Sequence, residues 1–134
     1  TKMGAKVKVV GPTTLMPKEI EKLGVTVCSD LKEGLKDADV VNILRVQLER
    51  QKKNLFPTLR EYATLFGVNS EKLKYAKPDC VVMHPGPMNR GIEISPNVAD
   101  GINSVINEQV TNGVAVRMAV LYLMGGGKKD EAFN

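Results

Sequence analysis

The feature of this sequence that most constrains its fold is the alternation of short β-branched runs with helix-length segments. The runs that predict strands lie at residues 6–10, 25–28, 40–44 and 80–83. The segments between them carry apolar residues at helical spacing, and this alternation is typical of a parallel sheet covered by helices. We therefore expect an α/β fold.

Helix signals fill the intervals between these runs. A helix is expected to begin near Pro17 and to end at Gly24, because proline favours the first helical position and glycine the position after the last turn. Further helices are predicted at residues 31–38, 58–66, 70–76 and 106–124. The last one carries a wide apolar face, so we expect it to be largely buried.

Length and composition exclude several classes of protein. The chain has 134 residues, of which 43% are hydrophobic and 25% charged, as in ordinary globular domains. No apolar run reaches the roughly 18 residues of a membrane helix, and no signal peptide is recognisable, so we expect no membrane contact and a cytoplasmic location. The net charge is +4, but the basic residues are scattered, so nucleic acid is not an expected partner.

The residues that bind metals and nucleotides are scarce. Cys28 and Cys80 each lie in an apolar strand run without a second cysteine nearby, which predicts buried, reduced thiols. One histidine, His84, leaves too few ligands for a metal site. Neither of the glycine-rich patterns that bind nucleotide phosphates occurs.

One cluster of polar residues directly follows the predicted strand at residues 40–44. In the stretch LRVQLER, Arg45, Gln47 and Glu49 point to one side of an extended chain. A guanidinium group next to an amide suits a substrate that carries carboxylates. The alternative is that Arg45, Glu49 and Arg50 form surface ion pairs of little energetic value, and spacing alone leaves both interpretations open.

A second cluster, MHPGPMNRGIEI at residues 83–94, follows the next predicted strand. Its prolines and glycines predict an unusual backbone path, with Gly86-Pro87 as a candidate cis peptide and with carbonyl and amide groups left for a ligand. A rigid turn without function is the alternative. His84 is either a general base or a hydrogen-bonded structural residue, and we assign it no catalytic role.

Four stretches of the sequence together resemble the aspartate carbamoyltransferases. They are KVKVVGPTTLMP, LRVQLER, MHPGPMNRGIEI and EQVTNGVAVRMAVLYL, and they span nearly the whole chain. They are similar to the C-terminal, aspartate-binding half of that enzyme's catalytic chain. The HPGP loop resembles this family more than the ornithine carbamoyltransferases, whose loop carries a cysteine after the histidine.

The resemblance implies transfer of the carbamoyl group of carbamoyl phosphate to the α-amino group of L-aspartate, a step of pyrimidine biosynthesis, without metal or organic cofactor. It implies that Arg45 and Gln47 bind L-aspartate and that Glu49 and Arg50 orient their loop. The residues that would contact the carbamoyl group of carbamoyl phosphate through backbone atoms are Pro85, Gly86 and Pro87.

The resemblance also implies that parts of the family's structure are absent. Residues 1–134 would form an N-terminally incomplete aspartate-binding domain with a Rossmann-like sheet, lacking the family domain's first strand and helix and the whole carbamoyl-phosphate domain. In the family the absent strand lies between the first and third strands of this chain, so we expect a gap in the sheet and no activity from this chain alone.

The partners that the resemblance implies are an N-terminal carbamoyl-phosphate domain and two further copies of the parent chain in a homotrimer. Regulatory or dihydroorotase subunits are open alternatives. Two other functions stay open: a non-catalytic, carbamoyltransferase-like assembly domain, and a carbamoyltransferase for another amino acid.

Overall fold

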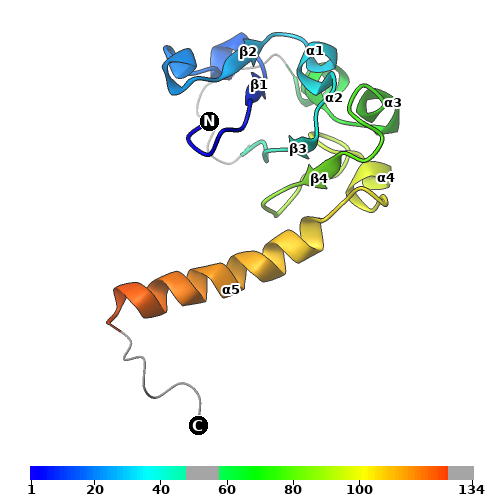
Figure 1. Ribbon diagram of the computed structural model, residues 1–134. Helices are drawn as coiled ribbons and strands as arrows, with labels where there is room; N and C mark the ends of the chain where they lie inside the picture. The colour runs from blue at the N-terminus through cyan, green and yellow to red at the C-terminus, as the bar shows by residue number, and fades with distance from the viewer. Residues whose placement is uncertain (48–57, 127–134) are drawn as a thin grey trace.

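A computed structural model describes residues 1–47 and 58–126, and Figure 1 shows their arrangement. The strands are β1 (Lys8–Val10), β2 (Thr26–Cys28), β3 (Val40–Asn42) and β4 (Val81–Met83). The α-helices are α1 (Leu31–Leu35), α2 (Leu59–Phe66), α3 (Ser70–Leu73), α4 (Pro96–Ala99) and α5 (Ile106–Met124). Two short 3-10 helices are η1 (Thr13–Leu15) and η2 (Ile20–Leu23).

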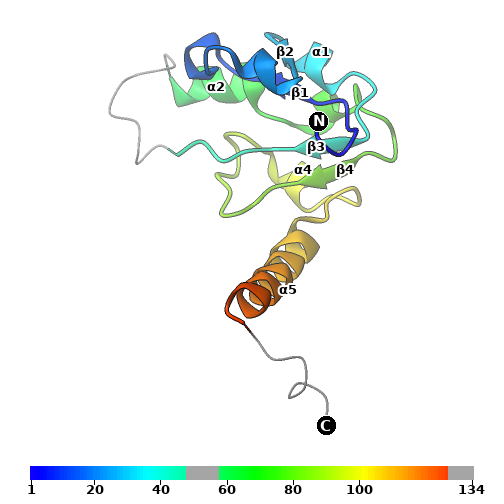
Figure 2. The same ribbon diagram turned by 60° about the vertical axis from the view of Figure 1, so that its left-hand side comes forward.

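The strands form two parallel pairs with a gap between them. β1 pairs with β2, Val9 lying opposite Val27, and β3 pairs with β4, Val41 lying opposite Val82. The two pairs are separate sheets, as Figure 2 shows, and a cavity of about 450 Å³ lies between β1 and β3. The parallel α/β architecture and the gap agree with the sequence-based predictions. Val40 is 53% exposed, which is unusual for an apolar strand residue and reflects the unpaired edge.

The hydrophobic core lies around β3 and β4 and is closed by the short helices. Val82 and Ile94 are fully buried, and Cys80 is almost so. Helices α1, α3 and α4 supply the other walls, through Leu31, Leu35 and Val98 among others. Each of these two strands buries its central residue, Val41 in β3 and Val82 in β4, whereas β1 has no buried residue.

Capping groups set the ends of α2. The Thr58 hydroxyl accepts a hydrogen bond from the Glu61 amide, which begins the helix where the sequence predicts it. At the other end the Gly67 amide donates to the carbonyl of Ala63 at 3.1 Å. Lys72 Nζ donates to the carbonyls of Thr64 and Gly67 at 2.6 and 2.9 Å, so carbonyls left free by the helix end are satisfied.

The helix predicted after Pro17 is shorter than expected. Only η2 forms, as a 3-10 turn, because Glu19 adopts a left-handed conformation with φ of 67° directly before it. A left-handed residue interrupts the right-handed helical path, so a helix cannot run through from Pro17. Gly24 ends the turn with φ of 76°, as predicted.

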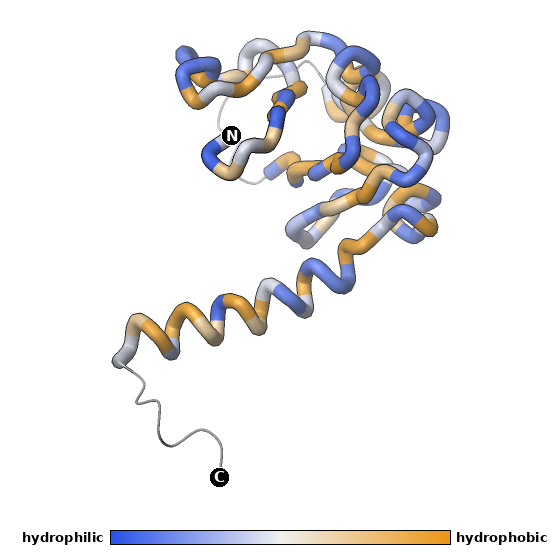
Figure 3. The backbone as a smooth tube through the Cα atoms, viewed as in Figure 1, coloured by the Kyte–Doolittle hydropathy of each residue, from blue (hydrophilic) through white to orange (hydrophobic). Residues whose placement is uncertain are grey.

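The prediction that the helix at residues 106–124 is largely buried is wrong. In α5 only Ile106 is buried, and Val114, Met118 and Leu121 are 52%, 65% and 66% exposed. The helix leaves the body of the chain at its first turn and projects away from both strand pairs, so its later turns meet no surface (Figure 1). Its apolar residues stand out as orange segments in Figure 3. None of the helices within residues 1–47 and 58–126 has the length and apolar content needed to cross a membrane.

Candidate functional site

The arginine segment, residues 44–47, continues β3 as an extended chain. The Ile43 amide donates to the Met83 carbonyl at 2.9 Å, which keeps this stretch beside the end of β4. Val46 is buried, whereas Arg45 is half-buried and Gln47 exposed. Over residues 45–47 the burial alternates as in an extended chain, with Arg45 and Gln47 on the face opposite Val46, whereas Leu44 is 67% exposed. Glu49 and Arg50, predicted to orient this loop, lie outside the described residues.

The proline loop, residues 84–90, leaves the end of β4. Its Gly86-Pro87 bond is cis, as predicted, and Gly86 has φ of 64°, a conformation that favours glycine. The Gly86 amide donates to His84 Nδ1 at 3.0 Å. Since Pro85 and Pro87 carry no N–H group and the Gly86 amide is bonded to His84, the backbone of residues 85–87 has carbonyl oxygens to offer and no free amide. The loop is therefore suited to binding N–H donors such as an amide or amine.

His84 is buried and fully hydrogen-bonded. Because its Nδ1 accepts from the Gly86 amide, the ring proton lies on Nε2, which donates to Glu93 Oε1 at 3.2 Å. The His84 backbone amide donates to Gln109 Oε1 at 3.0 Å, which joins the end of β4 to α5. These contacts favour the structural interpretation of His84 over the general-base interpretation.

A buried carboxylate joins the two segments. Glu93, only 1% exposed, accepts hydrogen bonds from the Asn89 backbone amide at 2.5 Å and from Asn89 Nδ2 at 3.1 Å. Asn89 Nδ2 also donates to the Val46 carbonyl at 2.9 Å. The proline loop is thus tied directly to the residue between Arg45 and Gln47. Sequence reasoning assigned no role to Glu93 or Asn89, although a glutamate between two isoleucines in GIEI is a sign of a buried charge.

The carboxylate also affects the neighbouring helix. Burial raises the pKa of the Tyr62 phenol, and the negative charge of Glu93 raises it further.

Arg90 forms a bidentate ion pair with Asp100 at the surface, with contacts of 2.6 and 2.9 Å. That guanidinium lowers the pKa of the Asp100 carboxyl. Arg90 is therefore committed to a surface contact and does not contribute to the site.

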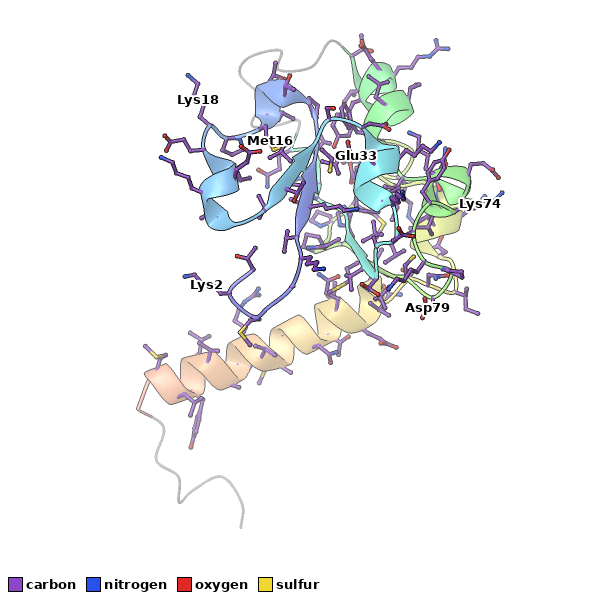
Figure 4. All side chains as sticks on the ribbon, turned by 45° about the horizontal axis from the view of Figure 1, so that its top comes forward. Lys2, Met16, Lys18, Glu33, Lys74 and Asp79 are labelled. Atoms are coloured by element: carbon purple, nitrogen blue, oxygen red, sulfur yellow. The ribbon has the colours of Figure 1, made fainter. Side chains whose placement is uncertain are left out.

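Other potentially reactive groups lie apart from the two segments. Cys28 and Cys80 are buried free thiols, as predicted, and burial raises the pKa of each. Within residues 1–47 and 58–126, no group of three or more metal-ligating side chains is placed to hold a metal ion. Figure 4 shows Lys2, Lys18 and Lys74 pointing outward from separate segments, so these three basic side chains form no common patch.

Comparisons with known proteins agree with this geometry. Residues 1–124 match the family model described as aspartate/ornithine carbamoyltransferase, Asp/Orn binding domain. The chain is 67% identical to the aspartate carbamoyltransferase catalytic subunit of Pelotomaculum thermopropionicum over 127 residues, which is 95% of this chain and 41% of that protein. It is 65% identical to the Moorella thermoacetica subunit of the same name, with the same coverage of 95% and 41%.

Solved structures give the same result. The ornithine carbamoyltransferase of Pyrococcus furiosus is 32% identical with a TM-score of 0.76, over 95% of this chain and 44% of that one. The aspartate transcarbamoylase of Trypanosoma cruzi, solved with carbamoyl aspartate and phosphate, is 28% identical with a TM-score of 0.67, over 87% of this chain and 39% of that one. The chain thus spans about two fifths of the length of these relatives. Sequence and fold agree, and this chain belongs to the aspartate/ornithine carbamoyltransferase family.

Proposed function

We propose that this chain is the aspartate-binding part of an aspartate carbamoyltransferase. In the proposed reaction the α-amino nitrogen of L-aspartate forms a bond to the carbonyl carbon of carbamoyl phosphate, the carbon–oxygen bond to phosphate breaks, and the amine loses a proton. The products are N-carbamoyl-L-aspartate and phosphate. One observation carries the proposal: the arginine segment and the proline loop meet at the carboxyl ends of two neighbouring parallel strands, where such sheets bind ligands.

The two segments have complementary chemistry for two substrates. Arg45 supplies a permanently charged guanidinium for the carboxylates of L-aspartate, with the Gln47 amide beside it. The two N–H groups of carbamoyl phosphate donate to carbonyl oxygens within the stretch Pro85, Gly86 and Pro87. Glu49 and Arg50 orient the arginine segment. Catalysis here consists of holding two anions together in a reactive geometry.

The proposed site requires a partner domain. The backbone of residues 85–87 offers acceptors only, so donors to the carbamoyl oxygen have to come from other residues. The phosphate group likewise needs cationic ligands beyond Arg45. We therefore propose an N-terminal carbamoyl-phosphate domain, a homotrimer of the parent chain, a cytoplasmic location, and no activity from these 134 residues alone. Regulatory and dihydroorotase subunits stay open as alternative additional partners.

The test uses a chimera in which this chain replaces the segment that it matches in the Pelotomaculum thermopropionicum catalytic subunit. Phosphate release from carbamoyl phosphate is measured with L-aspartate and, separately, with L-ornithine. We expect release with L-aspartate only, because Arg45 repels a cationic side chain. Transfer to ornithine would favour the other amino-acid specificity. A folded, trimeric chimera without transferase activity would favour the assembly-domain alternative.

A second measurement keeps the proposal testable if the chimera does not fold. Amide signals of this chain are followed by NMR during titration with a bisubstrate mimic, in which aspartate is joined to a phosphonate. We expect shifts at residues 44–47 and 84–90. Shifts that avoid both segments at saturating mimic would contradict the proposed site.

A further inference from the structure

We propose that Glu93 is a positioning residue that holds the arginine segment and the proline loop at a fixed spacing. This inference rests on the function proposed above. Glu93 is not itself a proposed substrate ligand, and its side chain contacts the proline loop at His84 and Asn89. Its side chain acts through Asn89, whose amide nitrogen lies 3.1 Å from Glu93 Oε2 and 2.9 Å from the Val46 carbonyl oxygen.

The hydrogen-bond inventory explains why this position carries a carboxylate. Three donors point at Glu93: the Asn89 backbone amide, Asn89 Nδ2 and His84 Nε2. An ionised carboxylate is an acceptor at both oxygens and satisfies all three, whereas a glutamine would turn an N–H₂ group towards one of them. The same bonds fix the orientation of the Asn89 side-chain amide. Its nitrogen carries two protons, and it donates one to Glu93 Oε2 and the other to the Val46 carbonyl oxygen.

Burial makes these contacts hard to replace. Glu93 and His84 are 1% and 0% exposed, and Val46 is 6% exposed, so these groups have given up nearly all of their contact with bulk water. A buried charge is costly unless its hydrogen bonds are complete, and removing one partner leaves the others unsatisfied. A change at Glu93 is therefore transmitted to Asn89 and to the Val46 carbonyl.

The position of Val46 connects this network to substrate binding. Val46 lies between Arg45 and Gln47, so a shift of its carbonyl moves both proposed aspartate ligands. In the proline loop, His84 Nδ1 accepts a hydrogen bond of 3.0 Å from the Gly86 amide, which fixes the backbone of the loop at Gly86. One carboxylate thereby fixes both halves of the proposed site, and small displacements of reacting groups cost large factors in rate.

The experiment measures kcat and KM in the chimera for Glu93→Gln, Asn89→Asp and the double variant that carries both changes. In Glu93→Gln we expect kcat/KM for L-aspartate to fall about tenfold to hundredfold, the size of effect that misplacement by about 1 Å has. The fall should appear mainly as a higher KM, because the displaced side chains, Arg45 and Gln47, are proposed to bind the substrate. The double variant exchanges donor and acceptor, so the contact between residues 89 and 93 re-forms. The new carboxylate at position 89 then has no proton for the Val46 carbonyl.

The double variant separates positioning from general stability. We expect it to recover the melting temperature lost in Glu93→Gln and to retain the raised KM. Recovery of both would overturn the proposal, because the link to Val46 would then be irrelevant. Asp100→Asn is the matched control: it makes the same chemical change at an exposed carboxylate in the surface pair with Arg90, and we expect kinetics within twofold of the parent.

Two further outcomes are distinguishable. If the unmodified chimera is folded and trimeric and makes no carbamoyl aspartate, the proposed function fails and the inference fails with it. If the chimera is active and Glu93→Gln has parental kinetics, the inference alone fails. Should Glu93→Gln not fold, Asn89→Ser decides the question, because it removes the link to Val46 and keeps the backbone amide that Glu93 binds. A parental KM in Asn89→Ser would then overturn the proposal.

Discussion

Gly67 is the position where the packing behind the site can be tested most directly. It lies between α2 and Val68, and a Cβ atom there would be 2.5 Å from the Ala63 carbonyl oxygen and well inside van der Waals contact of the Ile92 carbonyl oxygen. Its φ of −64° suits any residue, so the obstacle is steric and not conformational. Both obstructing atoms belong to the backbone, so rotation of a side chain does not relieve the clash.

The expected cost of Gly67→Ala follows from these contacts. Insertion of a methyl group into a well-packed site costs about 1–3 kcal/mol. The end of α2 must move away from the strand-like segment at Glu93, which weakens the hydrogen bond from the Val68 amide to the Glu93 carbonyl, 3.0 Å long, and each such bond contributes about 0.5–1.5 kcal/mol. Alanine recovers about 0.4–1 kcal/mol by restricting the unfolded chain. Together these terms give a net loss of about 0.5–4 kcal/mol, with a central value of about 2 kcal/mol.

The assay is urea unfolding of the 134-residue chain followed by circular dichroism. A loss of about 2 kcal/mol moves the midpoint down by about 1 M urea, or abolishes the folded baseline if the chain is only marginally stable. The matched control is Gly113→Ala in α5, where a Cβ would have no heavy atom within 4 Å, and we expect it to raise helical content without destabilising the chain. Equal midpoints for Gly67→Ala and the parent would refute the steric argument.

The remaining predictions concern charge and ionisation. Arg45→Ala in the chimera is expected to weaken L-aspartate binding by about 2–5 kcal/mol, and unaltered aspartate saturation would contradict the role proposed for Arg45. The pKa of Tyr62 is raised in the folded chain, so as pH rises through about 10 the phenol loses its proton in the unfolded chain first. The free energy of unfolding should therefore fall in this pH range, and the fall should be smaller in Tyr62→Phe. Cys28 and Cys80 should resist alkylation by iodoacetamide at pH 8 in the native chain and react once urea unfolds it, whereas rapid native labelling would mean that the core opens readily.

The strands could be predicted from sequence because their signal is local. Apolar β-branched runs mark β3 and β4, and the structure places both inside the predicted ranges. The start of α2 was equally predictable, because Thr58 caps a helix through its own side chain. The conformation of Glu19 was not, since a left-handed non-glycine residue leaves no reliable mark in a sequence.

The candidate site was predictable by position and not by connectivity. The positions of Arg45 and Gly86, directly after parallel strands, are sufficient to predict convergence at one edge of the sheet. The link between them depends on Asn89 reaching Val46, 43 residues earlier in the chain. Long-range hydrogen bonds of this kind have no periodicity, so only the three-dimensional structure identifies Glu93 as their common acceptor.

The exposure of α5 shows how a correct apolar pattern leads to a wrong expectation of burial. The residues that predicted a buried face, such as Val114 and Leu121, are apolar as the argument required, and they are more than half exposed. An apolar face indicates that a helix requires a partner surface, and it does not say which segment supplies that surface. A 19-residue helix of valine-rich sequence is marginal in water without packing, because β-branched residues lower helix propensity. The gap between β1 and β3 is a similar case. The edges of these strands that face the gap are unpaired and the cavity between them is open, so their backbone groups lack the hydrogen bonds that a neighbouring strand provides. The two features have one physical explanation: the apolar surface that this chain carries exceeds what its described residues cover.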